Sequence, residues 1–224
     1  MGMLRRLLAT LGRGDTQAEP IERYRFSADW FSMHTPAWRE LLARHVGPSP
    51  SILEIGAYEG NSTVWLLENA FRNGAGGHLC SIDSWQGGEE NDRSLMADVE
   101  ARFDHNVALA RKHVARGVTF EKRKGLSHHL LACMVAAGNR NGFDFVYIDG
   151  SHQAPDVLGD LVLCFLLLKV GGVFACDDYL WTLQPDPLHQ PKIAIDAFCA
   201  VYARKLRMID GLSDYQKYFL KIAD

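Results

Sequence analysis

Between residues 51 and 178 the sequence alternates short apolar runs with longer helical segments, and this alternation restricts the fold more than any other feature. The apolar runs predict five buried strands, at residues 52–55, 76–83, 117–123, 143–149 and 172–178. The segments between them predict helices at residues 62–71, 94–113, 127–137 and 155–169. Strands that alternate with helices in this way form a parallel sheet, connected by right-handed crossovers.

The C-terminal part of the sequence departs from this alternation. After a helix predicted near residues 193–205, the strand-like runs 206–212 and 215–222 follow each other within a few residues. A connection that short permits only an antiparallel pair. We therefore expect an α/β protein with a Rossmann-like, doubly wound, seven-stranded sheet that is mostly parallel and ends in a C-terminal antiparallel hairpin.

The first 47 residues precede the alternating pattern. Aromatic and apolar residues at roughly helical spacing in 24–45 predict an N-terminal helical cap, and the sequence "GPSP" ends it. We expect residues 1–47 to form an N-terminal arm and this cap, and residues 48–224 to form the main domain. The start of the chain, "MLRRLLAT", is interpreted as an amphipathic arm rather than a signal peptide.

Composition excludes several classes of partner. The chain of 224 residues has a net charge of −3 and a pI of about 6.3, so it lacks the basic footprint of a nucleic-acid-binding protein. Its longest apolar run, residues 161–168, is too short to span a bilayer, and we expect no membrane partner. Five cysteines without a C-x-x-C pair favour reduced thiols and a cytoplasmic location.

The turn after the first strand, in "LEIGAYEG", is where a doubly wound sheet places its ligand. Gly56 and Gly60 lie in this turn, but Tyr58 occupies the position where a dinucleotide-binding turn needs its second glycine. We also expect Glu54 and Glu59 to repel a pyrophosphate. The turn therefore favours a ligand without phosphate that carries an ammonium group and a sugar, as S-adenosylmethionine does.

Asp83 supports the same ligand. It ends the second predicted strand, where an acidic side chain can bind both ribose hydroxyls. Taken singly, the glycine turn also fits a packing role, and Asp83 also fits a plain strand end.

The stretch "LEIGAYEGNSTV" resembles the first motif of class I S-adenosylmethionine-dependent methyltransferases. The resemblance covers about residues 48–222 and is nearest to the small metal-dependent O-methyltransferases of the catechol type and the macrocin-type sugar enzymes. It implies a set of cofactor-binding residues: Glu54, Gly56, Ala57, Tyr58 and Gly60 for the methionine part, Ser62 and Thr63 for its carboxylate, Asp83 for the ribose, Leu126 and Ser127 with His128 for the adenine, and Asp149.

Carboxylates follow two neighbouring strands of the predicted sheet. Asp149 ends the fourth strand, and Asp177 and Asp178 end the fifth. Adjacent strands lie about 4.8 Å apart, so protonation, a basic side chain or a cation must relieve the repulsion. An all-oxygen set suits Mg²⁺ or a similar divalent cation. Metal-free methyltransferases also carry an acidic residue at this strand end, however, and a D-D pair also fits a cap or a turn.

The resemblance bears on this acidic set as well. Catechol-type enzymes place two aspartates and an asparagine at these strand ends, whereas this chain has Asp178 in the position of the asparagine. The more acidic set is similar to that of the macrocin-type relatives and of a cephalosporin-modifying branch. This departure bears on the identity of the acceptor more than on the presence of a metal.

His152 lies three residues after Asp149, where catechol-type enzymes have a lysine general base. Histidine titrates near neutrality and suits that role, but a fourth metal ligand and a histidine that caps the following helix remain alternatives. With His152 and Asp149 as catalytic residues, we expect methyl transfer to a hydroxyl of a small molecule such as a catechol, a sugar or another natural-product diol.

Several aromatic side chains and one histidine are candidates for lining the acceptor pocket. Candidate pocket residues are Trp30, Phe31, His34 and Trp38 in the cap, Trp85 in the loop 84–92, and Tyr179 and Trp181 after the fifth strand. For Trp30 and Trp38 we favour helix packing.

The alternatives to an O-methyltransferase are an oxidoreductase, a metal-bearing relative with hydroxylase-type activity, and a non-catalytic S-adenosylmethionine-binding protein. We also consider a homodimer.

Overall fold

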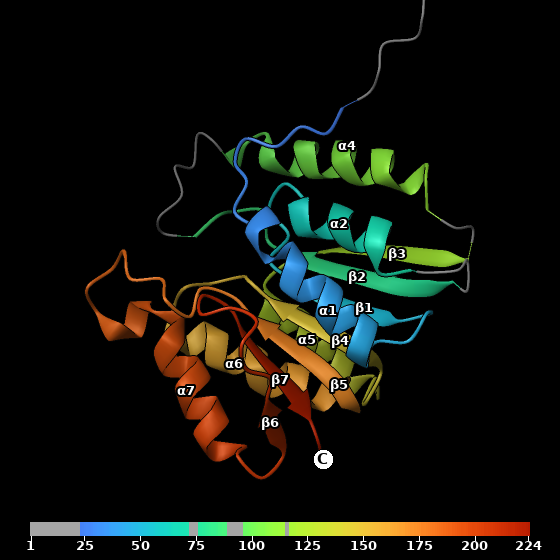
Figure 1. Ribbon diagram of the computed structural model, residues 1–224. Coiled ribbons are helices and arrows are strands. Elements are labelled where there is room, and N and C mark those ends of the chain that lie inside the picture. Colours follow the sequence, from blue (N-terminus) through green and yellow to red (C-terminus); the bar gives the residue numbers. More distant parts are fainter. Residues whose placement is uncertain (1–22, 72–75, 89–95, 115–116) are drawn as a thin grey trace, which may run out of the picture.

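The computed structural model describes residues 23–71, 76–88, 96–114 and 117–224 and has a single seven-stranded sheet at its centre (Figure 1). The strand order is β3-β2-β1-β4-β5-β7-β6. The strands are β1 (Ser51–Ile55), β2 (Gly77–Asp83), β3 (Val118–Lys124), β4 (Phe143–Ile148), β5 (Leu168–Cys176), β6 (Leu206–Met208) and β7 (Lys217–Lys221). The first five are parallel, and β7 runs antiparallel to both of its neighbours, as predicted.

Helices cover both faces of the sheet (Figure 1). One face carries α1 (Thr35–His45), α2 (Asn61–Asn69) and α4 (Val99–Arg111). The other carries α5 (Ser127–Ala136), α6 (Ala154–Leu167) and α7 (Pro191–Val201). Two short 3-10 turns, η1 (Ser32–His34) and η2 (Pro187–His189), precede α1 and α7. The doubly wound α/β fold expected from the sequence is therefore confirmed.

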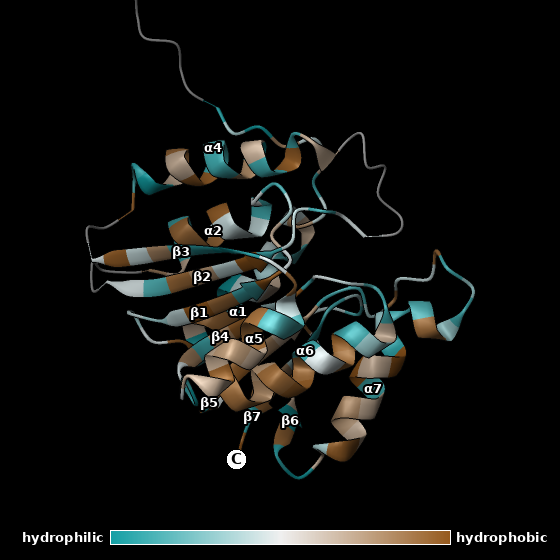
Figure 2. Cartoon of the chain, turned by 180° about the vertical axis from the view of Figure 1, so that it is seen from behind, coloured by the Kyte–Doolittle hydropathy of each residue, from teal (hydrophilic) through white to brown (hydrophobic). Residues whose placement is uncertain are grey.

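Alternation along the strands explains why both faces are buried. In β5, Val173 and Ala175 pack toward α1, α2 and α4, whereas Phe174 and Cys176 pack toward α5, α6 and α7. Successive side chains of a strand point to opposite faces, so strands covered on both sides are apolar throughout. Hydrophobic residues accordingly dominate β5 and the helices beside it (Figure 2).

The N-terminal helix α1 packs on the sheet itself. Trp38 is completely buried there and makes edge-to-face contacts with Phe145 and Tyr147 of β4. Within the described residues, α1 thus shares a core with the strands of the main domain. The division of the chain at residue 47 stays a prediction, and the predicted amphipathic arm lies outside the described residues.

The boundary between α6 and β5 differs from the predicted one. Helix α6 ends at Leu167 and β5 begins at Leu168, so Lys169 belongs to the strand rather than to the last helical turn. The strand register shifts between Phe143 and Phe145, which accommodates the extra residues of β5 around Gly171. The apolar run that predicted only a helix is shared between the helix and the strand, because both are buried there.

The C-terminal hairpin has shorter strands than the sequence suggested. Residues 209–216 connect β6 to β7, and Gly211 adopts a φ of +81° in this connection. Just before β7, the side chains of Tyr215 and Gln216 hydrogen-bond to Asp178 and Asp177, which follow β5. Of the helix predicted at residues 94–113, residues 94 and 95 lie outside the described part of the chain, and α4 spans only Val99–Arg111.

Within the described ranges, every helix is too short or too polar to cross a lipid bilayer. All five cysteines are free thiols.

Candidate active site

The turn after β1 forms around Gly56. Its N–H donates to the Ile82 carbonyl at 2.9 Å, and its φ is +84°. A Cβ atom at this position would lie only 1.8 Å from the carbonyl oxygen of Asp149, which follows β4. Glycine is therefore needed here because the β1 turn and the end of β4 touch through their backbones.

Asp83, at the end of β2, holds this turn in shape. Its Oδ2 accepts hydrogen bonds from the N–H groups of Ala57 and Tyr58, both at 2.8 Å, and its Oδ1 accepts one from Trp85 at 2.6 Å. Tyr58 and Trp85 both have positive φ, at 46° and 50°, which costs a non-glycine residue about 1 kcal/mol or more. The Asp83 carboxylate thus stabilises two strained positions, and it brings the two predicted cofactor-binding segments together.

Glu54 lies beneath the turn and is completely buried. Its oxygens accept hydrogen bonds from the hydroxyls of Ser62 at 2.5 Å, Thr63 at 2.6 Å and Ser81 at 2.6 Å. Burial raises the pKa of Glu54, and these three hydrogen bonds oppose that shift. The first turn of α2 is thereby fastened to β1 and β2. Contact of Glu54, Ser62 or Thr63 with a cofactor stays a prediction.

Glu59 also points inward. It is 1% exposed, accepts two hydrogen bonds from Ser27, and pairs with Arg102 of α4 at 2.5 Å. We expected Glu54 and Glu59 to repel a pyrophosphate, but neither carboxylate projects from the turn. The argument against a dinucleotide therefore depends on the glycine spacing and on Tyr58 in the middle position.

The segment predicted to line an adenine ring begins α5, beside Asp83. Gly125 donates its N–H to the Asp83 carbonyl at 2.9 Å, and the side chain of Leu126 next to it is 54% exposed. The Ser127 hydroxyl hydrogen-bonds to the buried Asp160 of α6. Leu126 and Ser127 thus share one edge of the sheet with the β1 turn, while His128 and His129 stack on each other at 6.0 Å.

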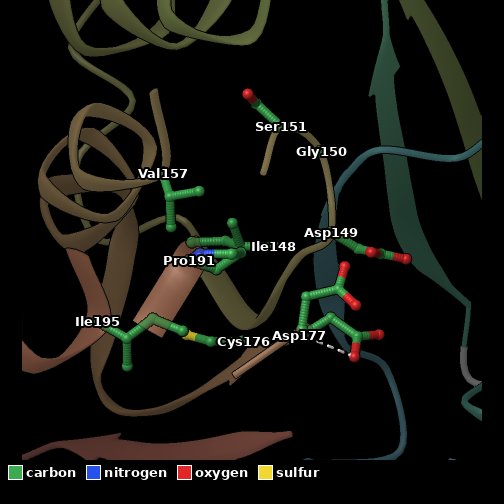
Figure 3. A pocket seen from close by; sticks show the side chains of 10 residues that line it. Ile148, Asp149, Gly150, Ser151, Val157, Cys176, Asp177, Pro191 and Ile195 are labelled. Atoms are coloured by element: carbon green, nitrogen blue, oxygen red, sulfur yellow. Dashed lines mark hydrogen bonds between the residues drawn. The ribbon is translucent and has the colours of Figure 1, made fainter. Parts of the chain in front are cut away.

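The predicted carboxylates meet at the adjoining strand ends. Cys176 pairs with Ile148, so Asp149 and Asp177 follow side by side, and Figure 3 shows both side chains on the same side of the strand ends. The Tyr147 hydroxyl lies 2.8 Å from Oδ2 of Asp149 and also contacts Oδ2 of Asp177. A phenol has one proton to donate, so the second contact needs a protonated carboxyl as its donor.

The titration of these carboxyls is consistent with that shared proton. Burial, followed by the charges of Asp177 and Asp178, raises the pKa of Asp149 well above its usual value. Burial and Asp178 raise the pKa of Asp177 to about 6. Close carboxylates in a buried site favour either a proton or a cation between them.

Asp178 also pairs with a histidine. It has a positive φ of 58°, and its Oδ2 pairs with Nε2 of His152 at 2.8 Å. Among the described residues, the three aspartates do not form a group in which one oxygen from each lies within 4.8 Å of the others. The His152 ring packs against Trp181 at 4.2 Å. Through Asp178, the structure thus brings His152 to the edge of the sheet where Asp149, Asp177 and Asp178 lie, which we call the acidic edge.

Four further residues belong to this edge. Gln216 donates to Oδ2 of Asp177 at 2.7 Å, and Nε2 of His34 lies 3.9 Å from Oδ1 of the same carboxylate. The ring of Tyr215 stacks on His34, and its hydroxyl hydrogen-bonds to Asp178. Tyr147 was detectable from the sequence, because it precedes Asp149 by two residues on the same face of β4. Gln216 and Tyr215 were not, since their placement depends on β7 lying beside β5.

A small hollow opens next to the carboxylates (Figure 3). Gly150, Ser151, Pro191 and Ile195 line it together with Asp149, Asp177 and Asp178, so α6 and α7 form its other wall. Of the aromatic pocket candidates, Phe31, Trp38 and Trp85 are buried in the core, whereas Trp30 is 65% exposed and packs on Tyr58 at 5.2 Å. Helix packing, which we favoured for both tryptophans, is confirmed for Trp38 but wrong for Trp30, which precedes η1 and is mostly exposed.

Comparison with known proteins agrees with this architecture. Residues 53–179, more than half of the chain, match the family described as "Methyltransferase domain". An O-methyltransferase from Bacillus cereus, solved in complex with SAH, has a similar structure: the TM-score is 0.56 at 18% identity, over 87% of this chain and 82% of that one.

Two enzymes of natural-product biosynthesis also have similar folds. CalS11, a TDP-rhamnose 3'-O-methyltransferase of calicheamicin biosynthesis, gives a TM-score of 0.57 at 14% identity, over 86% of this chain and 78% of that one. MycE of the mycinamycin pathway, solved with Mg, SAH and mycinamycin VI, gives 0.53 at 16% identity, over 87% of this chain and 50% of MycE.

Proposed function

Since the chain belongs to the methyltransferase domain family matched by residues 53–179 and is an S-adenosylmethionine-dependent methyltransferase, we propose that it methylates a hydroxyl of a small molecule with the help of a divalent cation. One observation carries the proposal: the Gly56 turn touches the backbone of Asp149, so the cofactor turn and the acidic edge adjoin. A methyl donor at the turn and an acceptor at the acidic edge would then be neighbours.

S-adenosylmethionine supplies the methyl group, and transfer to oxygen is an in-line displacement that depends on positioning. We assign the methionine part to the backbone of Gly56, Ala57, Tyr58 and Gly60, with Glu54, Ser62 and Thr63 supporting that turn. Asp83 keeps acceptor capacity for ribose hydroxyls because a carboxylate has about four lone-pair sites and three are used. Leu126 and Ser127 would lie along the adenine.

The donor set at the acidic edge fits a hard cation. Asp149, Asp177 and Asp178 offer only oxygen atoms, and burial together with the neighbouring carboxylates raises the pKa values of Asp149 and Asp177. Closing the set requires these side chains to shift, because one oxygen from each does not yet lie within 4.8 Å of the other two. When bound, Mg²⁺ or a similar divalent cation would lower the pKa of an acceptor hydroxyl and restrict its approach.

His152 is the proposed general base. Its hydrogen bond to Asp178 fixes the imidazole ring and would stabilise the imidazolium that forms when it takes the acceptor proton. Trp181 fixes the ring from its other side. Asp178 thus has two proposed roles, as a partner of His152 and as a metal ligand.

The acceptor would be a small molecule with adjacent hydroxyls, such as a catechol, a sugar or another natural-product diol. CalS11, whose fold is similar, is a TDP-rhamnose 3'-O-methyltransferase, and MycE was solved with Mg and mycinamycin VI. The five free thiols support a cytoplasmic enzyme. A homodimer is the proposed oligomeric state, and sedimentation of the purified chain tests it.

Binding of the cofactor product tests the first half of the proposal. We expect chelator-treated protein to bind S-adenosylhomocysteine with one-to-one stoichiometry in calorimetry, and not to bind NADH. Asp83→Ala should weaken binding at least tenfold, whereas the exposed Asp210→Ala should not change it. Unchanged affinity of Asp83→Ala would refute the ribose assignment.

Acceptor assays test the second half. Catechols and sugar nucleotides would be incubated with S-adenosylmethionine and Mg²⁺, with and without a chelator. Product that forms only when Mg²⁺ is present supports the proposal. Equal turnover in the presence of a chelator would remove the cation from the mechanism. Cofactor binding without turnover of any diol would instead favour a non-catalytic protein or a different reaction.

A further inference from the structure

A second group of potential metal ligands lies away from the acidic edge, on β2 and β3 (Figure 1). His78 and Cys80 are two residues apart on β2, and Glu121 of β3 pairs directly with Cys80 in the parallel ladder. Alternate residues of a strand share a face, and so do directly paired residues, which places all three side chains on one face. We propose that His78, Cys80 and Glu121 bind a borderline divalent transition ion of the Zn²⁺ class.

The site is separate from the one that the proposed function uses. Asp83 follows Cys80 by three residues and His78 by five on the same strand, which corresponds to roughly 10–17 Å at about 3.3 Å per residue. The three ligands therefore lie toward the opposite end of the sheet. Nothing in this inference depends on the assignment of the acidic edge.

Distances between the three side chains are close to those of a coordinated ion. One ligand atom from each residue lies within 4.8 Å of the other two, and Nε2 of His78 is 3.7 Å from Oε2 of Glu121. A tetrahedral ion with bonds of about 2.0–2.3 Å places neighbouring ligand atoms roughly 3.3–3.8 Å apart. His78 and Glu121 are 34% and 42% exposed and can close the remaining gap, while Cys80 is fixed in the core.

The surrounding hydrogen bonds orient His78 for metal binding. The Thr119 hydroxyl donates to the Gly77 carbonyl at 3.2 Å, so at 2.9 Å its oxygen accepts a hydrogen bond from the Nδ1–H of His78. Nε2 then carries the lone pair in the neutral imidazole, and it faces a carboxylate oxygen. Two acceptors that face each other need a cation or a proton between them. A partner on the second ring nitrogen is the usual support of a metal-binding histidine.

The carboxylate is oriented in a similar way. Nε of Arg123 donates to Oε1 of Glu121 at 2.8 Å, which leaves Oε2 directed at His78. Cys80 would bind the ion as its thiolate, with the ion in the place of the thiol proton. Binding of one ion would release that proton to solvent.

The mixture of ligand atoms determines which ion fits. One nitrogen, one sulfur and one oxygen suit Zn²⁺ or Co²⁺, whereas Mg²⁺ prefers oxygen ligands only. Three protein ligands leave a fourth position for water. Because His78 and Cys80 come from β2 and Glu121 from the outer strand β3, the ion would join this edge strand to the sheet.

Cobalt spectroscopy tests the site directly. Chelator-treated full-length protein is titrated with Co²⁺, and we expect a thiolate-to-cobalt charge-transfer band together with the visible bands of a tetrahedral ion. Cys80→Ser should abolish the charge-transfer band. His78→Gln and Glu121→Gln, at exposed positions that do not endanger folding, should weaken binding at least tenfold. Thr119→Val should weaken it about tenfold through the lost support of His78.

Two controls separate this site from other thiols and from the acidic edge. The exposed Cys133→Ser should keep the band, and so should Asp177→Asn, because the acidic edge has no sulfur ligand. A wild-type protein without the band would identify the cluster as an ion pair only and overturn the proposal. A band that persists in Cys80→Ser would overturn it as well.

Discussion

The side-chain amide of Gln216 donates a 2.7 Å hydrogen bond to Oδ2 of Asp177, the same oxygen that the Tyr147 hydroxyl contacts. Gln216 is completely buried, and its Oε1 accepts hydrogen bonds from Nε1 of Trp38 at 2.9 Å and from the Tyr218 hydroxyl at 2.6 Å. A single amide therefore connects the N-terminal helix α1 to the acidic edge.

Replacing this amide should destabilise the fold. In Gln216→Leu the buried Trp38 N–H and Tyr218 O–H lose their acceptor, at a cost of about 1–3 kcal/mol each. We expect the free energy of unfolding, measured in urea, to fall by about 2–5 kcal/mol. The exposed Gln184→Leu is the control and should change it by less than about 0.5 kcal/mol. Equal stability of the two variants would contradict the role of Gln216.

Gly56 and Gly138 form a matched pair for testing the contact between the β1 turn and β4. Both have a φ of +84°, but only at Gly56 would a Cβ atom meet another atom, the Asp149 carbonyl oxygen at 1.8 Å. Gly138→Ala should cost about 1 kcal/mol for its left-handed backbone alone. Gly56→Ala should cost several times more by thermal unfolding and should abolish S-adenosylhomocysteine binding. Similar losses in both variants would show that the close contact is unimportant.

Asp160 should make stability depend on pH. It is 1% exposed, its Oδ1 has no hydrogen-bond partner among the described residues, and burial raises its pKa to about 7. An acid whose folded pKa exceeds its unfolded value of about 3.9 favours folding below pH 4 and loses that contribution as the pH rises to 7. The loss amounts to at most about 4 kcal/mol.

Asp160→Asn removes this titration while it keeps an acceptor for Ser127. Urea unfolding at several pH values should show the variant to be more stable than the wild type at pH 8, with the difference shrinking toward pH 4. The exposed Asp210→Asn should follow the wild-type curve. If Asp160→Asn has the same pH dependence as the wild type, the carboxyl does not titrate as described.

His152 should affect turnover rather than binding. A positioned general base typically contributes 10²–10⁴-fold, so we expect kcat of His152→Ala to fall by about that factor, with the Kd for S-adenosylhomocysteine unchanged. Asp178→Asn, which keeps a hydrogen-bonding side chain beside the imidazole, should lose less. Full turnover of His152→Ala between pH 6 and 9 would exclude the base role and leave His152 as a structural partner of Asp178.

Much of the fold was predictable because its signals are local. Strand β4 is apolar apart from Asp144 and is followed by Asp149, and burial on both faces produces such runs in a parallel sheet. The same reasoning placed Asp83 and Asp177 at strand ends and therefore at one edge of the sheet. The boundary between α6 and β5 was misplaced because Leu167 and Leu168 are equally apolar and equally buried, so hydrophobicity does not separate them.

The sequence by itself determined the order of the strands and helices, the glycine turn after β1 and the acidic residues at the strand ends, because each depends on residues a few positions apart. The tertiary structure alone decided which side chains surround those acids. Trp38 and Gln216 are 178 residues apart and meet only because β7 inserts next to β5 while α1 covers that face of the sheet. Likewise, Glu54 faces three buried hydroxyls rather than solvent because β2 and α2 enclose it. Such contacts follow from strand order and register, which no local pattern encodes.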